Sequence, residues 1–221
     1  MKYLLFFVFY FEINSYETQK DFYEMSYQEF MSQDAVNQPI DVKNSNDNLL
    51  DATLFHATNE QRIKYNLPIF SYNSLVHKAA IGHSVDMIEQ DFYNHVNPYT
   101  QRKMEDRVTS YTIEFKRMAE NIAQHDLIET GKTSFYCSLI PKNDNDFIFR
   151  DCNTKQPLLM MTYANFARNV VKSWMNSPHH RENILDIRYT AMACSARLSK
   201  NPFRTRFSPF SRITQDFGGT M

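Results

Sequence analysis

Residues 174–185 read Trp-Met-Asn-Ser-Pro-His-His-Arg-Glu-Asn-Ile-Leu, a stretch in which an apolar helical pattern gives way to adjacent histidines. Apolar residues recur at helical spacing as far as Trp174, which predicts a helix over 163–175. Ser177-Pro178 predicts the end of that helix. We therefore expect His180 to be presented from a loop beside a helix end.

Three further residues with metal-binding chemistry lie upstream, namely His95, Asp106 and Glu120. With His180 they make two histidines and two carboxylates, the ligand types of an open zinc site or of an acid/base site. Residues 115–122 read as a strand, and a carboxylate inside an otherwise apolar strand must be paired or used. Glu120 is therefore the most informative of the four.

Each of these residues also has a structural interpretation. His95 could cap the turn before a proline, and Asp106 could form a surface ion pair. Glu105 could take the place of Asp106, and His179 that of His180. The remaining histidines are expected to be structural or surface residues: His56, His77, His83 and His125.

The rest of the chain reads as helices and strands. Asp47 or Asn48 can cap a helix that runs to about residue 65, and Ser74 can cap a second helix over 75–90. The other expected elements are a short helix at 104–108, strands at 115–122, 189–198 and 210–217, and the helix at 163–175. This order of helices, strand, helix and two strands indicates an α/β class.

Read in chain order, these segments resemble the CAP superfamily, which groups cysteine-rich secretory proteins, antigen 5 and plant pathogenesis-related proteins through the SCP domain. The likeness covers about residues 49–219 and is greatest to small single-domain members from bacteria and protists. Its motifs are His-Ala-Thr-Asn-Glu-Gln-Arg at 56–62, Leu-Pro at 67–68, Ala-Ala-Ile-Gly-His-Ser-Val-Asp-Met at 79–87 and Thr-Gln-Asp-Phe-Gly at 214–218. The resemblance implies a three-layer α-β-α sandwich with a central, mostly antiparallel sheet and a cleft that holds the four polar residues.

The resemblance also bears on the choice of site residues. Bacterial-type members carry an Asp before an Arg at the second site position, which favours Asp106 over Glu105. The usual glycine before the last histidine is His179 here, so either histidine can occupy that position.

Three functions are compatible with the resemblance. The one we favour is a secreted extracellular binding module in which His95 and His180 bind zinc, or else calcium, beside the cleft acids Asp106 and Glu120, with an extracellular protein, a lipid or a sterol as partner. The second is a metal-dependent peptidase or hydrolase in which Glu120 activates a metal-bound water. The third is a surface interaction protein with a vestigial cleft. No Ser or Cys nucleophile accompanies the four residues and no His-Glu-x-x-His helix occurs, which weakens the hydrolase hypothesis.

The N-terminal region resembles a targeting signal followed by a leader. Lys2 and a run of eight apolar residues at 4–11 predict a signal peptide at 1–15, because a membrane-spanning helix needs about 20 apolar residues. We expect no transmembrane segment in the mature chain. Residues 16–46 are polar and acidic and should be loosely ordered, although aromatic residues at near-helical spacing could dock one short helix. These are Phe22, Tyr23, Tyr27 and Phe30. The CAP/SCP domain should then occupy 47–219.

One insertion, at about 126–161, departs from the family pattern. Cys137 and Cys152 lie 15 positions apart within it, and a disulfide between them would cross-link the inserted loop. Cys194 falls in an expected strand and should be a buried free thiol.

Composition sets broad limits on the function. A chain of 221 residues with 43% hydrophobic content can bury one good core, and a net charge of −1 gives no reason to expect a nucleic-acid partner. A basic run from Arg197 to Arg212 predicts a solvated hairpin, with an anionic lipid surface as the alternative.

Overall fold

The computed structural model of the chain describes residues 22–129, 135–140, 143–199 and 208–220. The expected signal peptide at 1–15 and the basic hairpin tip at 200–207 lie outside these residues. No helix in the described ranges is both long enough and apolar enough to span a bilayer.

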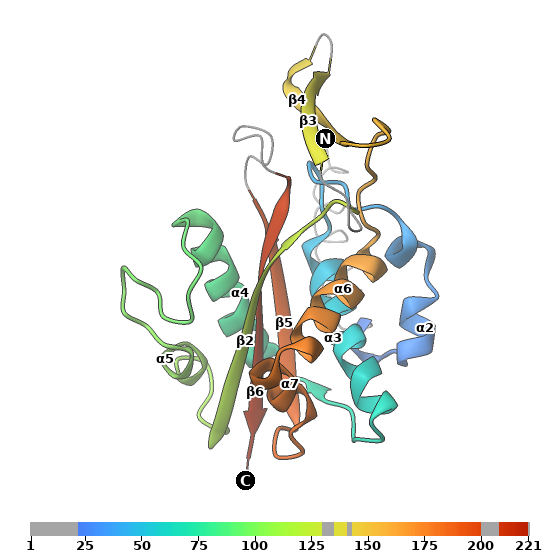
Figure 1. Cartoon of the computed structure of the whole chain (residues 1–221). Coiled ribbons are helices and arrows are strands. Elements are labelled where there is room, and N and C mark those ends of the chain that lie inside the picture. The colour runs from blue at the N-terminus through green and yellow to red at the C-terminus, as the bar shows by residue number, and fades with distance from the viewer. Residues whose placement is uncertain (1–21, 130–134, 141–142, 200–207, 221) are drawn as a thin grey trace, which may run out of the picture.

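A four-stranded sheet with the order β1-β5-β6-β2 forms the centre of the molecule (Figure 1). Its strands are β1 (Ser71–Tyr72), β2 (Arg117–Asp126), β5 (Ala191–Leu198) and β6 (Phe210–Gly219). β1 runs parallel to β5, whereas the β5–β6 and β6–β2 pairs are antiparallel. The expected mostly antiparallel central sheet is confirmed.

Helices cover both faces of this sheet, as Figure 1 shows. One face carries α3 (Asp47–Lys64), α6 (Tyr163–Asn176) and α7 (Pro178–Leu185). The other carries α4 (Ser74–Glu89) and α5 (Met104–Thr109). The α-β-α sandwich implied by the resemblance is therefore the observed fold.

Asparagines one residue upstream of the expected positions cap two of the helices. Asn46 accepts a hydrogen bond from the backbone N–H of Leu49 at 3.1 Å and caps α3, where Asp47 or Asn48 was expected. Asn73, rather than Ser74, caps α4 by accepting from two backbone N–H groups at 2.9 and 3.0 Å. Asn and Ser are comparable caps, so local propensity alone does not choose between neighbours.

The expectation that His180 lies in a loop is wrong. Residues after Ser177 form the helix α7, with Pro178 in its first turn. Proline at this position lacks only an N–H that would have no helical partner, so it starts a helix as readily as it ends one. His180 is therefore held on a helix.

The main core lies between the sheet and α3 and α6. Trp174 is 1% exposed there, and its indole Nε1–H donates to the Ile122 carbonyl at 3.1 Å, which ties α6 to β2. A second, smaller cluster on the opposite face joins α4 and α5 to the sheet through residues such as Val76, Val108 and Ala193. Cys194 is buried and free, as expected.

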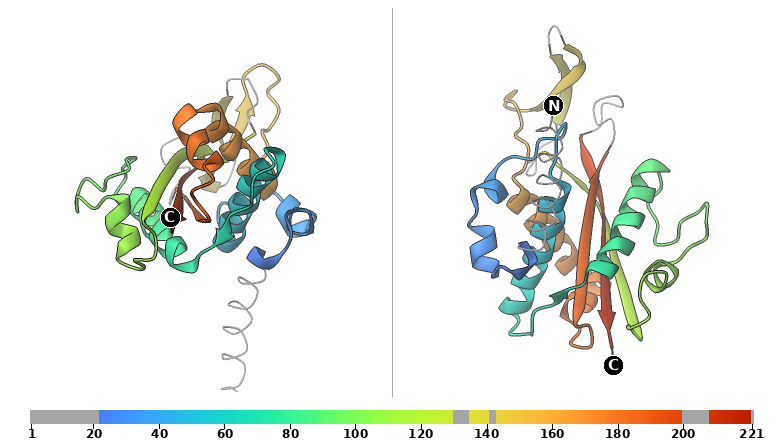
Figure 2. Two further views of the ribbon diagram at one scale, coloured as in Figure 1. Left: turned by 90° about the horizontal axis from the view of Figure 1, so that it is seen from below. Right: turned by 180° about the vertical axis from the view of Figure 1, so that it is seen from behind.

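The described part of the leader, residues 22–46, packs against the domain. α2 (Tyr27–Met31) lies against the outer side of α3 (Figure 2), and Phe30 and Val36 are fully buried in the main core. A 3₁₀ helix at Asp34–Asn37 follows. The alternative of one docked short helix therefore describes this segment better than a loosely ordered leader.

The insertion contains a separate two-stranded hairpin, β3 (Phe135–Ile140) and β4 (Asn143–Asp151), which projects beyond the main sheet (Figures 1 and 2). The expected disulfide is not formed, since Cys152 is a free thiol. The strand register places Cys137 opposite Phe149, whereas a disulfide needs the two Cα atoms within about 7 Å.

Candidate functional site

Glu120 is the centre of a buried polar cluster on the α4–α5 face of the sheet. Its side chain is only 3% exposed, and its Oε1 lies 2.8 Å from Nδ1 of His95. Its Oε2 accepts a hydrogen bond from Nη2 of Arg107, which is also buried. Both oxygens of Glu120 are therefore engaged, one by an imidazole and one by a guanidinium group.

His95 is held in place by the loop between α4 and α5. Asn97, 1% exposed, donates to the Asp86 carboxylate at 2.9 Å and accepts from the Tyr99 N–H at 2.9 Å. Arg107 donates to the His95 carbonyl at 3.1 Å, so the same guanidinium positions the backbone of His95 and the carboxylate that contacts its ring. The His95 side chain remains 53% exposed.

His83 on α4 belongs to the same cluster, although it was expected to be a structural or surface residue. It is fully buried, its Nε2 lies 3.0 Å from the Asn94 carbonyl, and the same nitrogen is 3.9 Å from Oε2 of Glu120. Burial lowers the pKa of His83 to about 4, and the nearby Glu120 opposes that shift without cancelling it. His83 is therefore neutral at physiological pH.

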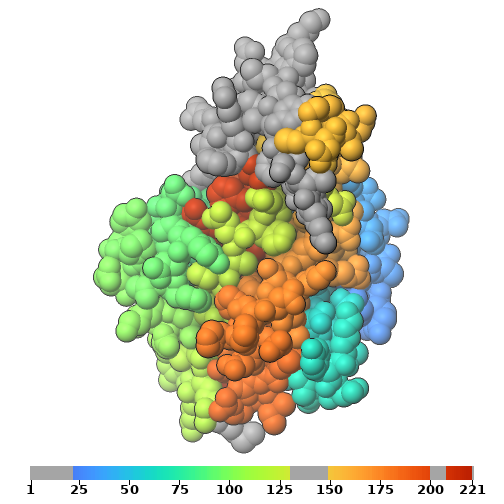
Figure 3. Space-filling view, viewed as in Figure 1, coloured from blue at the N-terminus to red at the C-terminus, as the bar shows by residue number. Residues whose placement is uncertain are grey.

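His180 approaches the cluster from α7, which packs on β2. Its backbone carbonyl accepts a hydrogen bond at 3.2 Å from Asn121, the residue after Glu120, and Asn183 donates to Asn121 at 2.9 Å. Burial lowers the pKa of His180, and His95 and His179 lower it further. The structure thus brings His180 and His95 close enough to interact electrostatically. Figure 3 shows the α6–α7 segment, in orange, beside the yellow-green β2 on one face of the molecule.

Asp106 and its neighbour Glu105 take other places. Asp106 is exposed and accepts a hydrogen bond at 3.0 Å from the backbone N–H of Lys103, which closes the first turn of α5. Glu105 is exposed on the same turn. It is Arg107, the next residue along, that points to Glu120.

The cluster also contains Asp216, which the sequence reasoning did not single out. Asp216 is fully buried on β6 and lies directly opposite Glu120 in the β2–β6 register. The argument applied to Glu120, that a carboxylate in a buried strand must be paired or used, would have found it. We call His83, His95, Arg107, Glu120 and Asp216 the Glu120 cluster.

Three other histidines have separate roles. His77 lies 2.9 Å from the buried carboxylate of Asp51, and His56 lies 2.7 Å from the Phe22 carbonyl, so both support packing. His125 contacts its neighbour's carbonyl at 2.9 Å.

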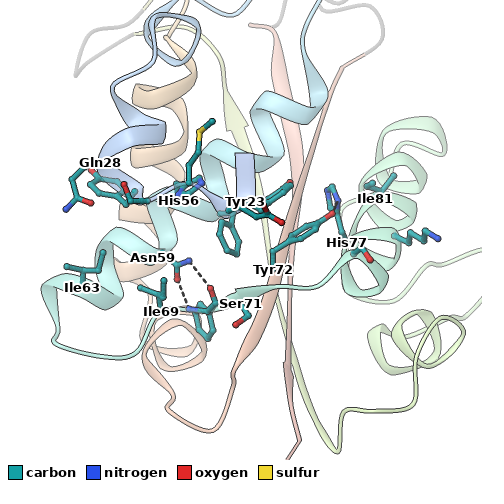
Figure 4. Close-up of a pocket in the computed structure, with 18 residues that line it drawn as sticks. Tyr23, Gln28, His56, Asn59, Ile63, Ile69, Ser71, Tyr72, His77 and Ile81 are labelled. Carbon is teal, nitrogen blue, oxygen red and sulfur yellow. Dashed lines mark hydrogen bonds between the residues drawn. The ribbon is translucent and has the colours of Figure 1, made fainter. Parts of the chain in front are cut away.

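A pocket of about 850 Å³ lies away from the Glu120 cluster, between the leader, α3 and α4 (Figure 4). Asn59 at its edge forms two hydrogen bonds with the backbone of Phe70, and the Tyr72 hydroxyl lies 2.9 Å from His77. Its wall includes the exposed apolar side chains Ile63 and Ile69. The pocket is thus a mainly apolar cavity, and among the described residues that line it the buried Tyr23 hydroxyl has no hydrogen-bond partner.

The family model of cysteine-rich secretory proteins, the CAP family, matches residues 55–207. The chain belongs to the CAP family. In this CAP chain the match covers both histidines, Glu120 and Arg107, whereas Asp216 lies beyond its end.

Three of the solved structures with similar folds come from bacteria. An extracellular protein containing an SCP domain from Bacillus anthracis is 21% identical, with a TM-score of 0.49, over 78% of this CAP chain and 41% of that one. An outer surface protein from Borrelia burgdorferi is 16% identical, with a TM-score of 0.49, over 83% of this chain and 98% of that one. A cysteine-rich secretory protein from Staphylococcus aureus is 15% identical, with a TM-score of 0.42, over 77% and 38%. This chain therefore spans less than half the length of two of the three. No curated protein matches it.

Proposed function

We propose that this protein is an extracellular binding module in which His95 and His180 hold a divalent cation, zinc by preference. The observation that carries the proposal is the contact between His95 Nδ1 and Glu120 Oε1 at 2.8 Å. A carboxylate that accepts from one ring nitrogen fixes the histidine tautomer and leaves the other nitrogen free as a ligand. The half-exposed ring of His95 supplies such a nitrogen.

His180 supports the same proposal as the second ligand. Metal binding requires a neutral imidazole, and burial lowers the pKa of His180 and so favours that form. In the described ranges no three His, Cys, Asp or Glu side chains are grouped as metal ligands. Two imidazole ligands would leave the other coordination positions of the cation open to water or to a carboxylate of a binding partner. A bound cation would supply positive charge at this site. Imidazole ligands suit zinc better than calcium.

The geometry favours binding over hydrolysis. A general base must have a lone pair within reach of the water whose proton it takes. Both oxygens of Glu120 instead accept hydrogen bonds within the protein, from His95 and Arg107, and the side chain is 3% exposed. Glu120 therefore acts as the residue that orients His95.

The extracellular part of the proposal rests on two observations. The family that matches is a secretory one, and the chain begins with a short apolar run of the signal-peptide type.

The test of the cation site is zinc titration by calorimetry at neutral pH and near pH 5. We compare the wild type with His95→Ala/His180→Ala and use His125→Ala, a histidine outside the proposed site, as the control. Wild type and control should bind zinc, the double variant should not, and binding should weaken at the lower pH as the imidazoles gain protons. Equal binding by all three proteins would contradict the proposal.

A second binding activity is favoured by the pocket in Figure 4. Ligand pockets typically measure about 300–1,000 Å³, and the volume here, about 850 Å³, falls in that range. Its apolar wall suits the body of a lipid or sterol. Ile69→Asp should lower binding of a fluorescent sterol, whereas Ile187→Asp, an exposed residue that does not line the pocket, should leave it unchanged. Equal loss or no loss in both variants would contradict a site here.

A further inference from the structure

Asp216 and Glu120 place two carboxyl groups side by side inside the protein. The two residues are directly opposite each other on the antiparallel strands β6 and β2, and such residues point to the same face of a sheet. Glu120 faces α4 and α5, where it contacts Arg107 and approaches His83. Asp216 therefore faces the same helices, and it is 0% exposed.

Among the described residues, no hydrogen-bond donor reaches the Asp216 carboxyl group. Neither of its oxygens receives a hydrogen bond from any residue in the described part of the chain. An ionised carboxylate can only accept hydrogen bonds, whereas a protonated one can donate. As a carboxylate, Asp216 would therefore lack any donor, whereas a protonated Asp216 would have the Glu120 carboxylate, directly opposite it in the sheet, as an acceptor.

The charges around Asp216 lead to the same conclusion. The charged groups that act on it are Glu120 from β2 and Arg107 and Glu105 from α5, and His83 from α4 lies beside Glu120. Arg107 is already paired with Glu120, and burial keeps His83 neutral. On β5 the residue opposite Asp216 is Ala193, which offers no charge. If Asp216 were ionised, its carboxylate would lie beside the Glu120 carboxylate without a cation of its own. This strongly disfavours ionisation of Asp216.

We propose that Asp216 is a neutral carboxylic acid that donates a hydrogen bond to Glu120 and so holds the Glu120 carboxylate in the orientation that contacts His95. Burial, and after it the carboxylate of Glu120, raise the pKa of Asp216 well above its usual value, in agreement with this assignment. Asp216 is then a positioning residue that acts on His95 through Glu120. The hydrogen bond needs no metal, and only its effect on cation binding rests on the proposed function.

Infrared spectroscopy of the metal-free full chain at neutral pH tests the assignment directly. A protonated carboxyl group gives a carbonyl band that is separate from the bands of carboxylates, and isotope-labelled aspartate identifies it as aspartyl. The wild type should show one such band, and Asp216→Asn should lose it while keeping a donor in nearly the same shape. The control Asp34→Asn, at an exposed aspartate, should retain it.

Absence of the band in the wild type would overturn the proposal, and so would its persistence in Asp216→Asn. The first result would mean that Asp216 is ionised, with buried water as its donor. Because the wild type alone decides this point, a variant that folds poorly does not remove the test. A chain that binds no zinc but shows the band would retain this inference and lose only the proposed cation site.

The positioning role has its own readout in the tautomer of His95, measured by nitrogen NMR. Asp216→Asn should keep the wild-type tautomer, because the amide still donates to Glu120. Asp216→Leu removes the donor and should lower the fraction of His95 protonated at Nδ1. An unchanged tautomer in both variants would show that Glu120 does not depend on Asp216.

Discussion

His95 Nδ1 lies 2.8 Å from Glu120 Oε1, and this contact joins an imidazole that is 53% exposed to a carboxylate that is 3% exposed. The buried partner is rigid because Arg107 holds its other oxygen. In the proposed cation site, this pairing would let the exposed His95 act as a ligand while a buried carboxylate fixes its orientation.

Glu120→Gln should therefore impair both the site and the fold. Loss of an outer partner of a metal ligand typically costs about 10- to 100-fold in affinity, and we expect a loss of zinc affinity in this range. The substitution also leaves the buried Arg107 without its counterion, which should lower the free energy of unfolding by about 3 kcal/mol. Calorimetry and urea denaturation measure the two effects.

A double-mutant cycle with Arg107→Met separates the ion pair from other losses. Arg107→Met should also be destabilising, because it removes hydrogen bonds to the carbonyls of His95 and Arg102. Combined with Glu120→Gln, it should cost clearly less than the sum of the single changes. Strict additivity would mean that the two residues do not stabilise each other.

His83 should make stability depend on pH in the acidic range. Its pKa in the folded state is about 4, against 6.5 as the ordinary value, so between these values the unfolded chain binds the extra proton. Stability should thus fall as pH decreases from about 6.5 to about 4, by roughly 3 kcal/mol from this group. His83→Gln should flatten that part of the profile, whereas His179→Gln, at an exposed histidine, should not. Parallel profiles for the wild type and His83→Gln would be inconsistent with a buried neutral His83.

Asp216 should produce the opposite slope. Because its pKa is raised in the folded state, the folded chain holds a proton that the unfolded chain releases above about pH 4. Its contribution is greatest below that pH and is lost as pH rises toward the folded-state pKa. Asp216→Asn should therefore gain stability relative to the wild type as pH increases. A difference between the two proteins that stays constant with pH would argue against a protonated Asp216.

Phe30→Ala tests whether the leader folds with the domain. Phe30 is 0% exposed and stacks on His56 with ring centroids 4.2 Å apart, so its loss should cost about 3–5 kcal/mol. Gln28→Ala, an exposed change on the same short helix, should cost little. If both variants unfold like the wild type in urea, the leader does not contribute to the core.

Much of the fold could be predicted from the sequence, since the motifs at 56–62, 79–87 and 214–218 occur in an order that implies the sandwich. The pairing of Glu120 was also predictable, because a charge inside a buried strand must have a partner. Its partner Arg107 was not, because the resemblance placed the preceding residue, Asp106, in the cleft, whereas the Asp106 carboxylate closes the first turn of α5.

The remaining differences arise where local patterns are ambiguous. Ser-Pro fits both the end of one helix and the start of another, so His180 was expected in a loop although it lies on α7. His83 lies within the motif at 79–87, but the motif does not show which side chain faces the site, and only the packing of α4 on the sheet brings His83 to Glu120. Asp216 was predictable as a charge inside an expected strand, but its position opposite Glu120 depends on strand register, which one strand's sequence does not specify.

The most direct test of the account is the ring-nitrogen NMR spectrum of the histidines during zinc titration at neutral pH. A cation site oriented by Glu120 requires that His95 be protonated at Nδ1 before zinc is added and that zinc change the Nε2 signal of His95 together with a ring-nitrogen signal of His180. His77 and His83, which are buried, should remain unchanged. Zinc that leaves both His95 and His180 unchanged would contradict a cation site oriented by Glu120.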